Sequence, residues 1–162
     1  MSKRRSLLLV SAVALLLFAP ALSAQTLQVV NADGKTSTLT AGQIAGMPHV
    51  TVSVRDHDTP TEFDGVPLSA LLSLVGIPLG ASLHGPRLTE ALLAEAADGY
   101  KVVFALAEFD PDFASREIIL ADKRDGKPLA PKEGPFRIVA PGDKRPARWI
   151  REVTALRIIA VK

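Results

Sequence analysis

The sequence predicts a single α+β domain that is rich in short strands and poor in helices. Polar and apolar residues alternate in several short runs, which is the pattern of half-buried strands. Turn residues separate these runs, and only one stretch shows a clear helical stripe of apolar side chains. Strands do not alternate regularly with helices, so a parallel α/β fold is not expected.

Length and composition support a folded domain without disulfides. The chain has 162 residues, of which 48% are hydrophobic and 22% are charged, so it holds enough apolar side chains for one core. It contains no cysteine. This absence excludes a disulfide framework, a thiolate metal site, an iron–sulfur cluster and a cysteine nucleophile.

Residues 1–24 have the layout of a secretory signal peptide. Three basic residues precede an apolar run at 7–19, and small residues follow that end at Ala24. We therefore expect a periplasmic or secreted protein in which residues 25–162 form one domain; an uncleaved N-terminal anchor is the alternative. Without this segment the formal net charge changes from +2 to −1, so a nucleic-acid partner is not expected.

The first elements of the domain should be a hairpin and a short helix. Residues 26–30 and 35–39 alternate around an Asn-Ala-Asp-Gly turn, which indicates two paired strands. Thr40 and Gln43 match a capping box, because each side chain can bond the backbone N–H of the other. The helix that they start should end near Gly46.

A strand at 49–54, a polar loop at 55–62 and a longer helix should follow. Pro67 suits the first position of this helix, because a proline there loses no helical hydrogen bond. Gly76 suits its end. One apolar stripe repeats at helical spacing between them and consists of Leu68, Leu71, Leu72 and Val75.

In the second half, the Asp98-Gly99 pair predicts a hairpin between strands at 91–97 and 100–106. A helix over 88–97 is the alternative, because that stretch is rich in helix formers. The remaining elements should be a turn or short helix at 107–114 and strands at 117–121, 136–140 and 154–161.

Three ordered groups of residues resemble a known family. The first reads Phe63-x-Gly65-Val66-Pro67-Leu68-x-x-Leu71-Leu72-x-x-x-Gly76. The second is Asp98-Gly99-Tyr100 with Glu108-x-Asp110 after it, and the third is Gly126-x-Pro128-Leu129, Gly134-Pro135-x-Arg137, Pro141-Gly142 and Arg148-Trp149-Ile150. In this order and spacing they resemble the sulfite-oxidase-type molybdopterin-binding domain. The resemblance spans about residues 49–159 and implies a mixed and antiparallel, β-rich fold.

One departure from the family decides the functional expectation. The enzymes of this family hold molybdenum through a cysteine thiolate in the loop after the strand that matches residues 49–54. The corresponding stretch here is Val54-Arg55-Asp56-His57. Without the thiolate the metal loses its covalent tie to the protein. We therefore expect no metal site, no covalently bound cofactor and no catalytic residues, and we do not expect the molybdenum cofactor.

By resemblance the chain belongs with short, exported, cysteine-free members of this fold. Some of those members bind a pterin without metal and pass the signal to a membrane partner. This implies a non-catalytic binding domain for a pterin-like heterocycle, with a membrane sensor protein as partner. The alternatives are an oxidoreductase, or a subunit of one, that holds molybdopterin without the cysteine, and a structural or interaction domain without a ligand.

The candidate ligand-binding residues follow from the chemistry of a pterin. Its 2-amino-4-oxo edge suits a carboxylate, for which Glu108 and Asp110 are candidates, and its flat ring suits an aromatic face, for which Trp149 and Tyr100 are candidates. A loop-capping role for the acids and a core role for the aromatic residues are the alternatives. Two further candidates, Arg55 and His57, lie in the stretch that matches the lost cysteine.

Positive charge is concentrated after residue 131. Residues 132–162 have a net charge of +5, whereas residues 25–131 have a net charge of −6. Arginines near Pro-Gly turns suit anion recognition, although a solvated basic surface is the alternative. The candidates for binding a phosphate or carboxylate of a ligand are Arg137, Lys144, Arg145 and Arg148.

Overall fold

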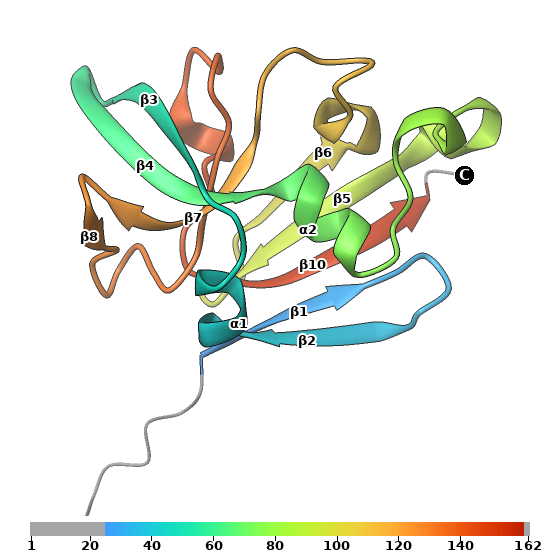
Figure 1. Cartoon of the computed structure of the whole chain (residues 1–162), viewed down its shortest axis with the longest axis horizontal. Coiled ribbons are helices and arrows are strands. Elements are labelled where there is room, and N and C mark those ends of the chain that lie inside the picture. The colour runs from blue at the N-terminus through green and yellow to red at the C-terminus, as the bar shows by residue number, and fades with distance from the viewer. Residues whose placement is uncertain (1–24, 161–162) are drawn as a thin grey trace, which may run out of the picture.

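The computed structural model describes residues 25–160, which form two β-sheets with a few short helices around them (Figure 1). The predicted signal peptide at 1–24 lies outside the described residues. Within them, no helix is both long and apolar enough to cross a membrane. The α+β class and the mixed, largely antiparallel sheets agree with the prediction.

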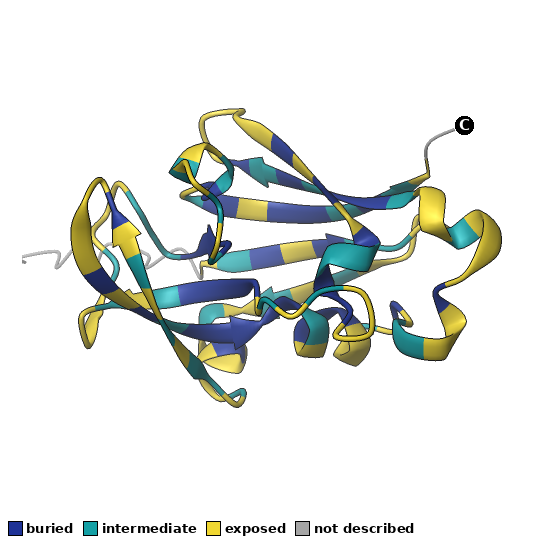
Figure 2. Ribbon diagram, turned by 90° about the horizontal axis from the view of Figure 1, so that it is seen from above, coloured by how far each residue is buried: buried dark blue, intermediate teal, exposed yellow. Residues whose placement is uncertain are grey.

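The first sheet holds the hairpin that was predicted at the start of the domain. Its strand order is β2-β1-β10-β5-β6, and its only parallel pair is β1 with β10. Buried and exposed residues alternate along β1, with Leu27 and Val29 facing the core (Figure 2). The strands are β1 (Thr26–Val30), β2 (Thr36–Thr40), β5 (Glu90–Ala96), β6 (Lys101–Ala105) and β10 (Val153–Ala160).

The second sheet has the order β3-β4-β7-β8, and β9 pairs with β7 as well. All of its pairs are antiparallel. In Figure 1 these strands lie on the left, whereas those of the first sheet lie toward the right. The strands are β3 (Val50–Asp56), β4 (Thr59–Pro67), β7 (Ile119–Arg124), β8 (Lys127–Pro128) and β9 (Arg137–Val139).

The helices are short. Helix α1 (Ala41–Ala45) starts at the predicted capping box, in which Thr40 Oγ1 accepts from the Gln43 N–H at 3.2 Å and Gln43 Oε1 accepts from the Thr40 N–H at 2.8 Å. Helix α2 (Leu68–Leu74) buries three residues of the predicted stripe, and Pro67 is its N-cap rather than its first residue. The 3-10 helices are η1 (Gly80–Ser82), η2 (Gly85–Thr89), η3 (Leu106–Phe109) and η4 (Pro146–Arg148).

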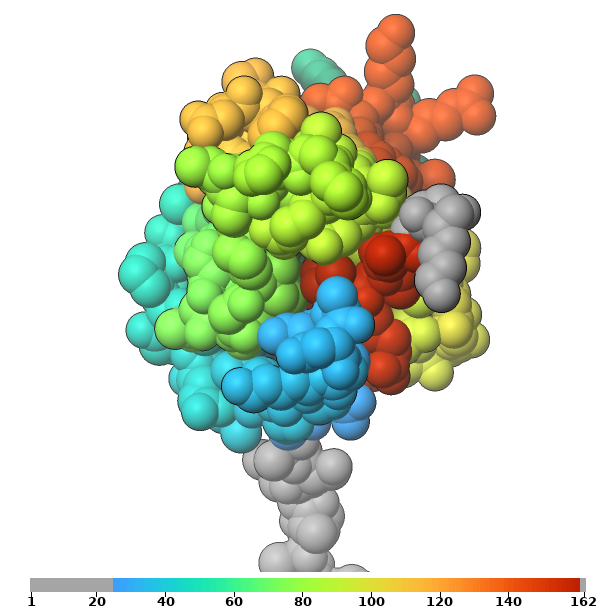
Figure 3. All heavy atoms as spheres, turned by 90° about the vertical axis from the view of Figure 1, so that its right-hand side faces the viewer, coloured from blue at the N-terminus to red at the C-terminus, as the bar shows by residue number. Residues whose placement is uncertain are grey.

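One apolar core joins the two sheets and α2. It includes Leu92 and Leu156 of the first sheet, Phe63 and Ile119 of the second, and Leu71 of α2, all of them fully buried. Each such side chain contributes about 1.5–3 kcal/mol by leaving water. Figure 3 shows that the segment of η1 and η2 covers one end of the molecule beside β10 and above the β1–β2 hairpin.

The polar loop predicted at 55–62 was wrong, because this stretch completes the β3–β4 hairpin. The strands pair from Val50 with Gly65 up to Asp56 with Thr59, and only His57 and Asp58 form the turn. Both turn residues have positive φ, 49° and 67°, as a tight hairpin turn of the primed type requires. The prediction failed because neither residue is glycine and because the strand is polar. The strand at 91–97 and its Asp98-Gly99 hairpin are confirmed.

Candidate functional site

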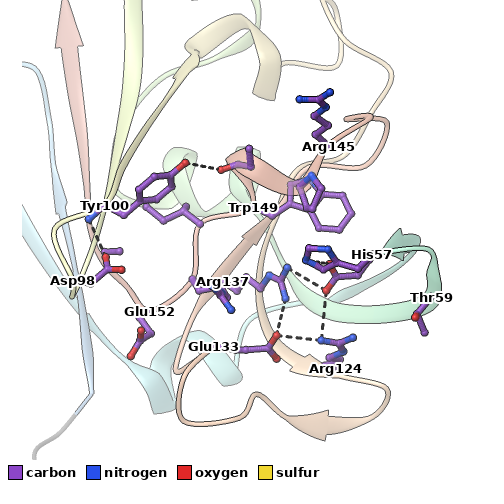
Figure 4. Close-up of a pocket in the computed structure, with 16 residues that line it drawn as sticks. His57, Thr59, Asp98, Tyr100, Arg124, Glu133, Arg137, Arg145, Trp149 and Glu152 are labelled. Atoms are coloured by element: carbon purple, nitrogen blue, oxygen red, sulfur yellow. Dashed lines mark hydrogen bonds and ion pairs between the residues drawn. The ribbon is translucent and has the colours of Figure 1, made fainter.

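One cavity of the described structure, here called the main cavity, has a volume of about 740 Å³. It is bordered by the turn of the β3–β4 hairpin, the turn of the β5–β6 hairpin, residues 145–152 before β10, and side chains from the end of β7, the start of β9 and the loop between them (Figure 4). Its lining residues include four carboxylates and four arginines. These are Asp56, Asp98, Glu133 and Glu152, and Arg124, Arg137, Arg145 and Arg151.

Four of these side chains form what we call the four-charge cluster: Asp56, Arg124, Glu133 and Arg137. Asp56 Oδ2 lies 3.3 Å from Arg137 Nη2 and 3.5 Å from Arg124 Nη1. Glu133 Oε1 accepts from Arg137 Nη1 at 2.9 Å and from Arg124 Nη1 at 3.1 Å. Two carboxylates and two guanidinium groups therefore neutralise one another at the wall of the cavity.

The two central members of the cluster are removed from solvent. The side chains of Asp56 and Arg137 are only 3% and 4% exposed. The Arg137 guanidinium carbon lies 4.9 Å from the Phe63 ring centroid and 5.9 Å from that of Trp149, so the charge is also held by cation–π contacts. Burial lowers the pKa of Arg137 from its ordinary value, and the charges of Asp56 and Glu133 oppose that shift.

Trp149 holds a fixed position in the cavity wall. Its indole N–H donates to the Ala140 carbonyl at 3.0 Å, and its ring meets Phe63 edge to face at 6.5 Å. The residue is only 4% exposed. Trp149 therefore has the core position that was the alternative for it, although it also borders the cavity.

Tyr100 and His57 line the accessible side of the main cavity, on either side of the Arg137 side chain (Figure 4). Tyr100 is 52% exposed, and its hydroxyl donates to the Ala147 carbonyl at 3.0 Å. The His57 side chain is 85% exposed, and its Nε2 lies 3.7 Å from Asp56 Oδ1. Arg145 also lines the cavity but points away from the four-charge cluster.

A second cavity of about 480 Å³ shares His57, Pro146 and Trp149 with the first. It is lined by two more of the predicted residues, Arg55 and Lys144. Arg55 Nη1 also donates to the Asp58 carbonyl at 3.2 Å, which supports the hairpin turn. The fold thus brings seven of the ten predicted residues to two adjoining hollows: Arg55, His57, Tyr100, Arg137, Lys144, Arg145 and Trp149.

Arg148 and Glu108 belong to a different group, which we call the Arg148 network together with Arg116 and Asp143. Arg148 donates to both Asp143 oxygens at 2.8 and 3.0 Å and to both Glu108 oxygens at 3.2 and 3.1 Å. Arg116 donates to Asp143 at 2.7 Å and also to Glu108. The Arg148 guanidinium carbon lies 4.7 Å from the Phe104 ring centroid.

The Arg148 network shifts the pKa values of its members. Burial acts to raise the pKa of Asp143, but hydrogen bonds from Arg148 and Arg116 outweigh it and hold that pKa below its ordinary value. The bond to Asp143 likewise raises the pKa of Arg148, against the effect of burial. Neither Arg148 nor Glu108 lines either of the two cavities, so a ligand role for them stays a prediction.

Asp110 is a buried carboxylate that accepts hydrogen bonds from the backbone. It is fully buried, and its two oxygens accept from the backbone N–H groups of Gly80 at 2.5 Å and Asp112 at 2.9 Å. These bonds tie the η1 segment to the chain after η3. Asp110 lines neither cavity, so its ligand role also stays a prediction.

Sequence reasoning missed most of the charges that define the site. Asp56 was considered only as part of the stretch that matches the cysteine, because a polar loop was expected there and not a hairpin. Glu133 lies four residues before Arg137, and Arg124 is the last residue of β7. Arg116 and Asp143 pair across 27 positions, and no local pattern predicts that contact.

Comparison with known proteins adds to this geometry. The model of the oxidoreductase molybdopterin-binding domain matches residues 20–160. The chain belongs to this family. The sulfane dehydrogenase SoxCD of Paracoccus pantotrophus has a similar structure, with a TM-score of 0.66 and 22% sequence identity. The match covers 86% of this chain but only 40% of the SoxCD chain, so the present domain spans less than half of that protein. None of the curated proteins matches the chain.

The residues of this member of the molybdopterin-binding family do not fit a metal held by the protein. The stretch that matches the family cysteine ends β3 and forms its turn, and its buried group is the Asp56 carboxylate, already paired with two arginines. The chain has no thiolate to offer. Residues 25–160 contain no group of three or more His, Cys, Asp or Glu side chains arranged to hold a metal ion. Thiolate ligation of molybdenum is therefore not available to this chain.

Proposed function

We propose that this domain is an exported, non-catalytic binding protein for a pterin-like heterocycle, which acts through a membrane-bound sensor. One observation carries the proposal. At the stretch where the family has its metal-binding cysteine, this chain has a buried, arginine-paired carboxylate in the wall of an open cavity. The chain offers no thiolate to a metal there, whereas an open cavity lies beside the carboxylate.

The main cavity has the properties that a small flat ligand needs. Its volume of about 740 Å³ falls within the range of about 300–1,000 Å³ that is common for small-molecule sites. Tyr100 offers an accessible aromatic face at its edge, against which a pteridine ring can stack. The four-charge cluster offers polar groups beneath that ring, held in place by their mutual ion pairs.

Free basic side chains at the rim suit a ligand with an anionic tail. Arg145 and Arg151 line the main cavity, and Lys144 lines the second cavity beside it. Arg145 and Lys144 are exposed, so they can approach a phosphate or carboxylate without losing an internal partner. Of the predicted anion-binding residues, Arg137 and Arg148 are each already engaged by two carboxylates.

Calorimetry with oxidised and reduced pterins tests the binding function. Purified residues 25–162 should bind at least one of them with a dissociation constant in the micromolar range or below. Tyr100→Ala should weaken this binding roughly tenfold, since base–aromatic stacking contributes about 1–3 kcal/mol. Val103→Ala, on the neighbouring strand and outside both cavities, is the matched control. Absence of binding at high micromolar ligand contradicts the proposal.

A molybdopterin-dependent oxidoreductase, or a subunit of one, is the second candidate. Family membership and the likeness to SoxCD favour it. Metal analysis of protein purified from a host that makes molybdopterin separates the two candidates. Stoichiometric molybdenum in the purified protein would reverse their order.

The membrane sensor is supported by the predicted signal peptide and by the resemblance to exported, cysteine-free members of the fold. Its gene should lie beside the gene for this chain and encode a periplasmic sensory domain. A neighbouring gene for a haem-containing membrane subunit would instead favour electron transfer.

A further inference from the structure

The four-charge cluster leaves one of its own polar atoms without a partner. Asp56 Oδ2 is engaged by Arg137 and Arg124, but Asp56 Oδ1 has no hydrogen-bond donor within bonding distance. The side chain is 97% buried, since its relative exposure is 3%. Buried carboxylate oxygens ordinarily have a donor, so this atom needs an explanation.

The unpartnered oxygen belongs to a residue that lines the main cavity. His57 Nε2 lies 3.7 Å from this oxygen, which is too long for a hydrogen bond. The His57 side chain is 85% exposed and stands in a two-residue turn, so it can change rotamer without disturbing the core. A ligand that enters the cavity can therefore take its place beside Asp56.

We propose that Asp56 Oδ1 accepts a hydrogen bond from an N–H group of the ligand and that it thereby selects the ligand's class. The ligand would be a planar heterocycle with N–H donors along one edge, such as the 2-amino-4-oxopyrimidine edge that pterins share with guanine. This inference rests on the proposed binding function and deepens it. It also assigns the specificity to Asp56 instead of Glu108 or Asp110, whose carboxylates are engaged elsewhere.

The charge of the site fits this class of ligand edge. A carboxylate is an acceptor only, so it favours a donor edge and disfavours a carbonyl or an anion in the same place. Arg137 Nε, which is also buried and without a partner, is a donor on the other member of the ion pair. The ion pair therefore leaves one acceptor and one donor without a partner, and the proposal rests on the acceptor, Asp56 Oδ1.

The test compares two pteridines and two variants by calorimetry. Pterin has N–H donors along its pyrimidine edge, whereas 1,3-dimethyllumazine has the same ring system and no N–H donor there. Asp56→Asn keeps the size of the side chain but removes its charge. Asp58→Asn changes an exposed acid in the same turn, outside the main cavity, and is the matched control.

We expect the unaltered domain to bind pterin about 10- to 100-fold more tightly than 1,3-dimethyllumazine, because a hydrogen bond to a charged group changes affinity by about this factor. Asp56→Asn should weaken pterin binding by a similar factor and leave 1,3-dimethyllumazine unchanged, whereas Asp58→Asn should change neither. Thermal unfolding of both variants shows whether they are folded. If Asp56→Asn does not fold, the two ligands on the unaltered domain decide the question by themselves.

The outcomes separate this inference from the proposed function. Equal binding of both pteridines, or full pterin binding by Asp56→Asn, overturns the role of Asp56 and leaves a pteridine-binding protein. A third outcome is that neither pteridine binds, that guanosine binds, and that Asp56→Asn abolishes guanosine binding. This outcome supports the role of Asp56 and contradicts a pterin ligand. If no ligand with this edge binds, both are overturned.

Discussion

The charged guanidinium group of Arg137 is almost completely buried in the domain. Its guanidinium contacts Asp56, Glu133, Phe63 and Trp149, and its side chain is 4% exposed. A buried ion pair contributes little net stability when compared with apolar residues of the same size, but the loss of one partner leaves the other charge buried and unpaired. The pair therefore fixes an arrangement of charges at the cavity more than it strengthens the fold.

Replacement of Arg137 should be costly for this reason. We expect Arg137→Met to lower the free energy of unfolding by about 3–5 kcal/mol, measured by urea denaturation at neutral pH. The double variant Asp56→Leu/Arg137→Met should be more stable than Arg137→Met alone, because no buried charge is left without a partner. If the double variant is no more stable than the single one, the cost comes from packing and not from the charge.

Arg148 and Arg145 are close in sequence but should behave differently. Arg148→Ala removes the central donor of the Arg148 network and should lower the free energy of unfolding by about 1–3 kcal/mol, with pterin binding unchanged. Arg145→Ala should change the free energy of unfolding by less than about 0.5 kcal/mol, and it should weaken the binding only of ligands with an anionic tail. Urea denaturation and calorimetry on both variants check this; a binding loss in Arg148→Ala would support the ligand role predicted for it.

At the scale of single residues, the sequence indicated several of the side chains that lie at the cavities. It did not indicate the contacts that these side chains make there. Trp149 and Arg137 were predicted as binding residues and both line the main cavity, but the sequence could not show that they pack on each other and on Phe63. Glu108 and Arg148 pair across forty positions, and no local pattern reveals such a contact. Asp56 was overlooked because its importance depends on its burial and on its ion pair with Arg137, which lies 81 positions away in the chain.

At the scale of elements, the second sheet depends on one close approach between strands. The register of β4 with β7 shifts between Asp64 and Gly65, and there the β4 backbone comes so close to β7 that no side chain fits. A Cβ on Gly65 would lie 2.4 Å from the Leu120 carbonyl oxygen and 2.5 Å from Ala121 Cα. Gly65 belongs to the first family motif, and the close packing of β4 against β7 explains why a glycine is needed at this position.

Gly65→Ala should therefore force β4 and β7 apart. We expect it to lower the free energy of unfolding by roughly 3 kcal/mol or more, because backbone atoms must shift. Gly46→Ala is the matched control: its φ is −84°, its nearest Cβ contact is 3.6 Å, and stability should change by less than about 1 kcal/mol. Thermal and urea unfolding of both variants measures this. If the two substitutions change stability equally, the β4 backbone can move away from β7 at little cost.

Local signals explain which elements could be predicted. The capping box of α1, the stripe of α2 and the Asp98-Gly99 hairpin all depend on residues close in sequence, and all three were found. The β3–β4 hairpin was missed because its turn, His57-Asp58, has no glycine and adopts positive φ only under the pairing of the strands. The parallel pairing of β1 with β10 joins the two ends of the domain, and no local pattern predicts it.

At the scale of the whole molecule, ion pairs connect segments that are far apart in the chain. The Arg148 network links η3, η4 and the residues around Arg116 and Asp143. Within the first sheet, Glu95 of β5 pairs with Lys101 of β6 and Arg157 of β10 at 2.7 Å each. Hydrogen bonds from Lys101 and Arg157 lower the pKa of Glu95, as those from Arg148 and Arg116 lower that of Asp143.

These two carboxylates should make the domain sensitive to acid. A carboxyl whose pKa is lower in the folded state than in the unfolded chain stabilises the fold at pH values above its ordinary pKa, about 4. That contribution is lost as the pH falls from about 5 through the lowered value, because the folded state then takes up protons later than the unfolded chain. The free energy of unfolding should therefore decrease steadily below pH 5.

Asp143→Asn isolates the part of this effect that belongs to the Arg148 network. The variant should be less stable than the unaltered domain at pH 7, and its stability should fall less steeply between pH 5 and pH 3, since one titrating group has been removed. Asp112→Asn, at an exposed position outside the network, should keep the original slope. Urea denaturation at a series of pH values measures these slopes. Parallel pH profiles for Asp143→Asn and the unaltered domain would mean that other carboxylates, with Glu95 as the first to replace, account for the acid sensitivity.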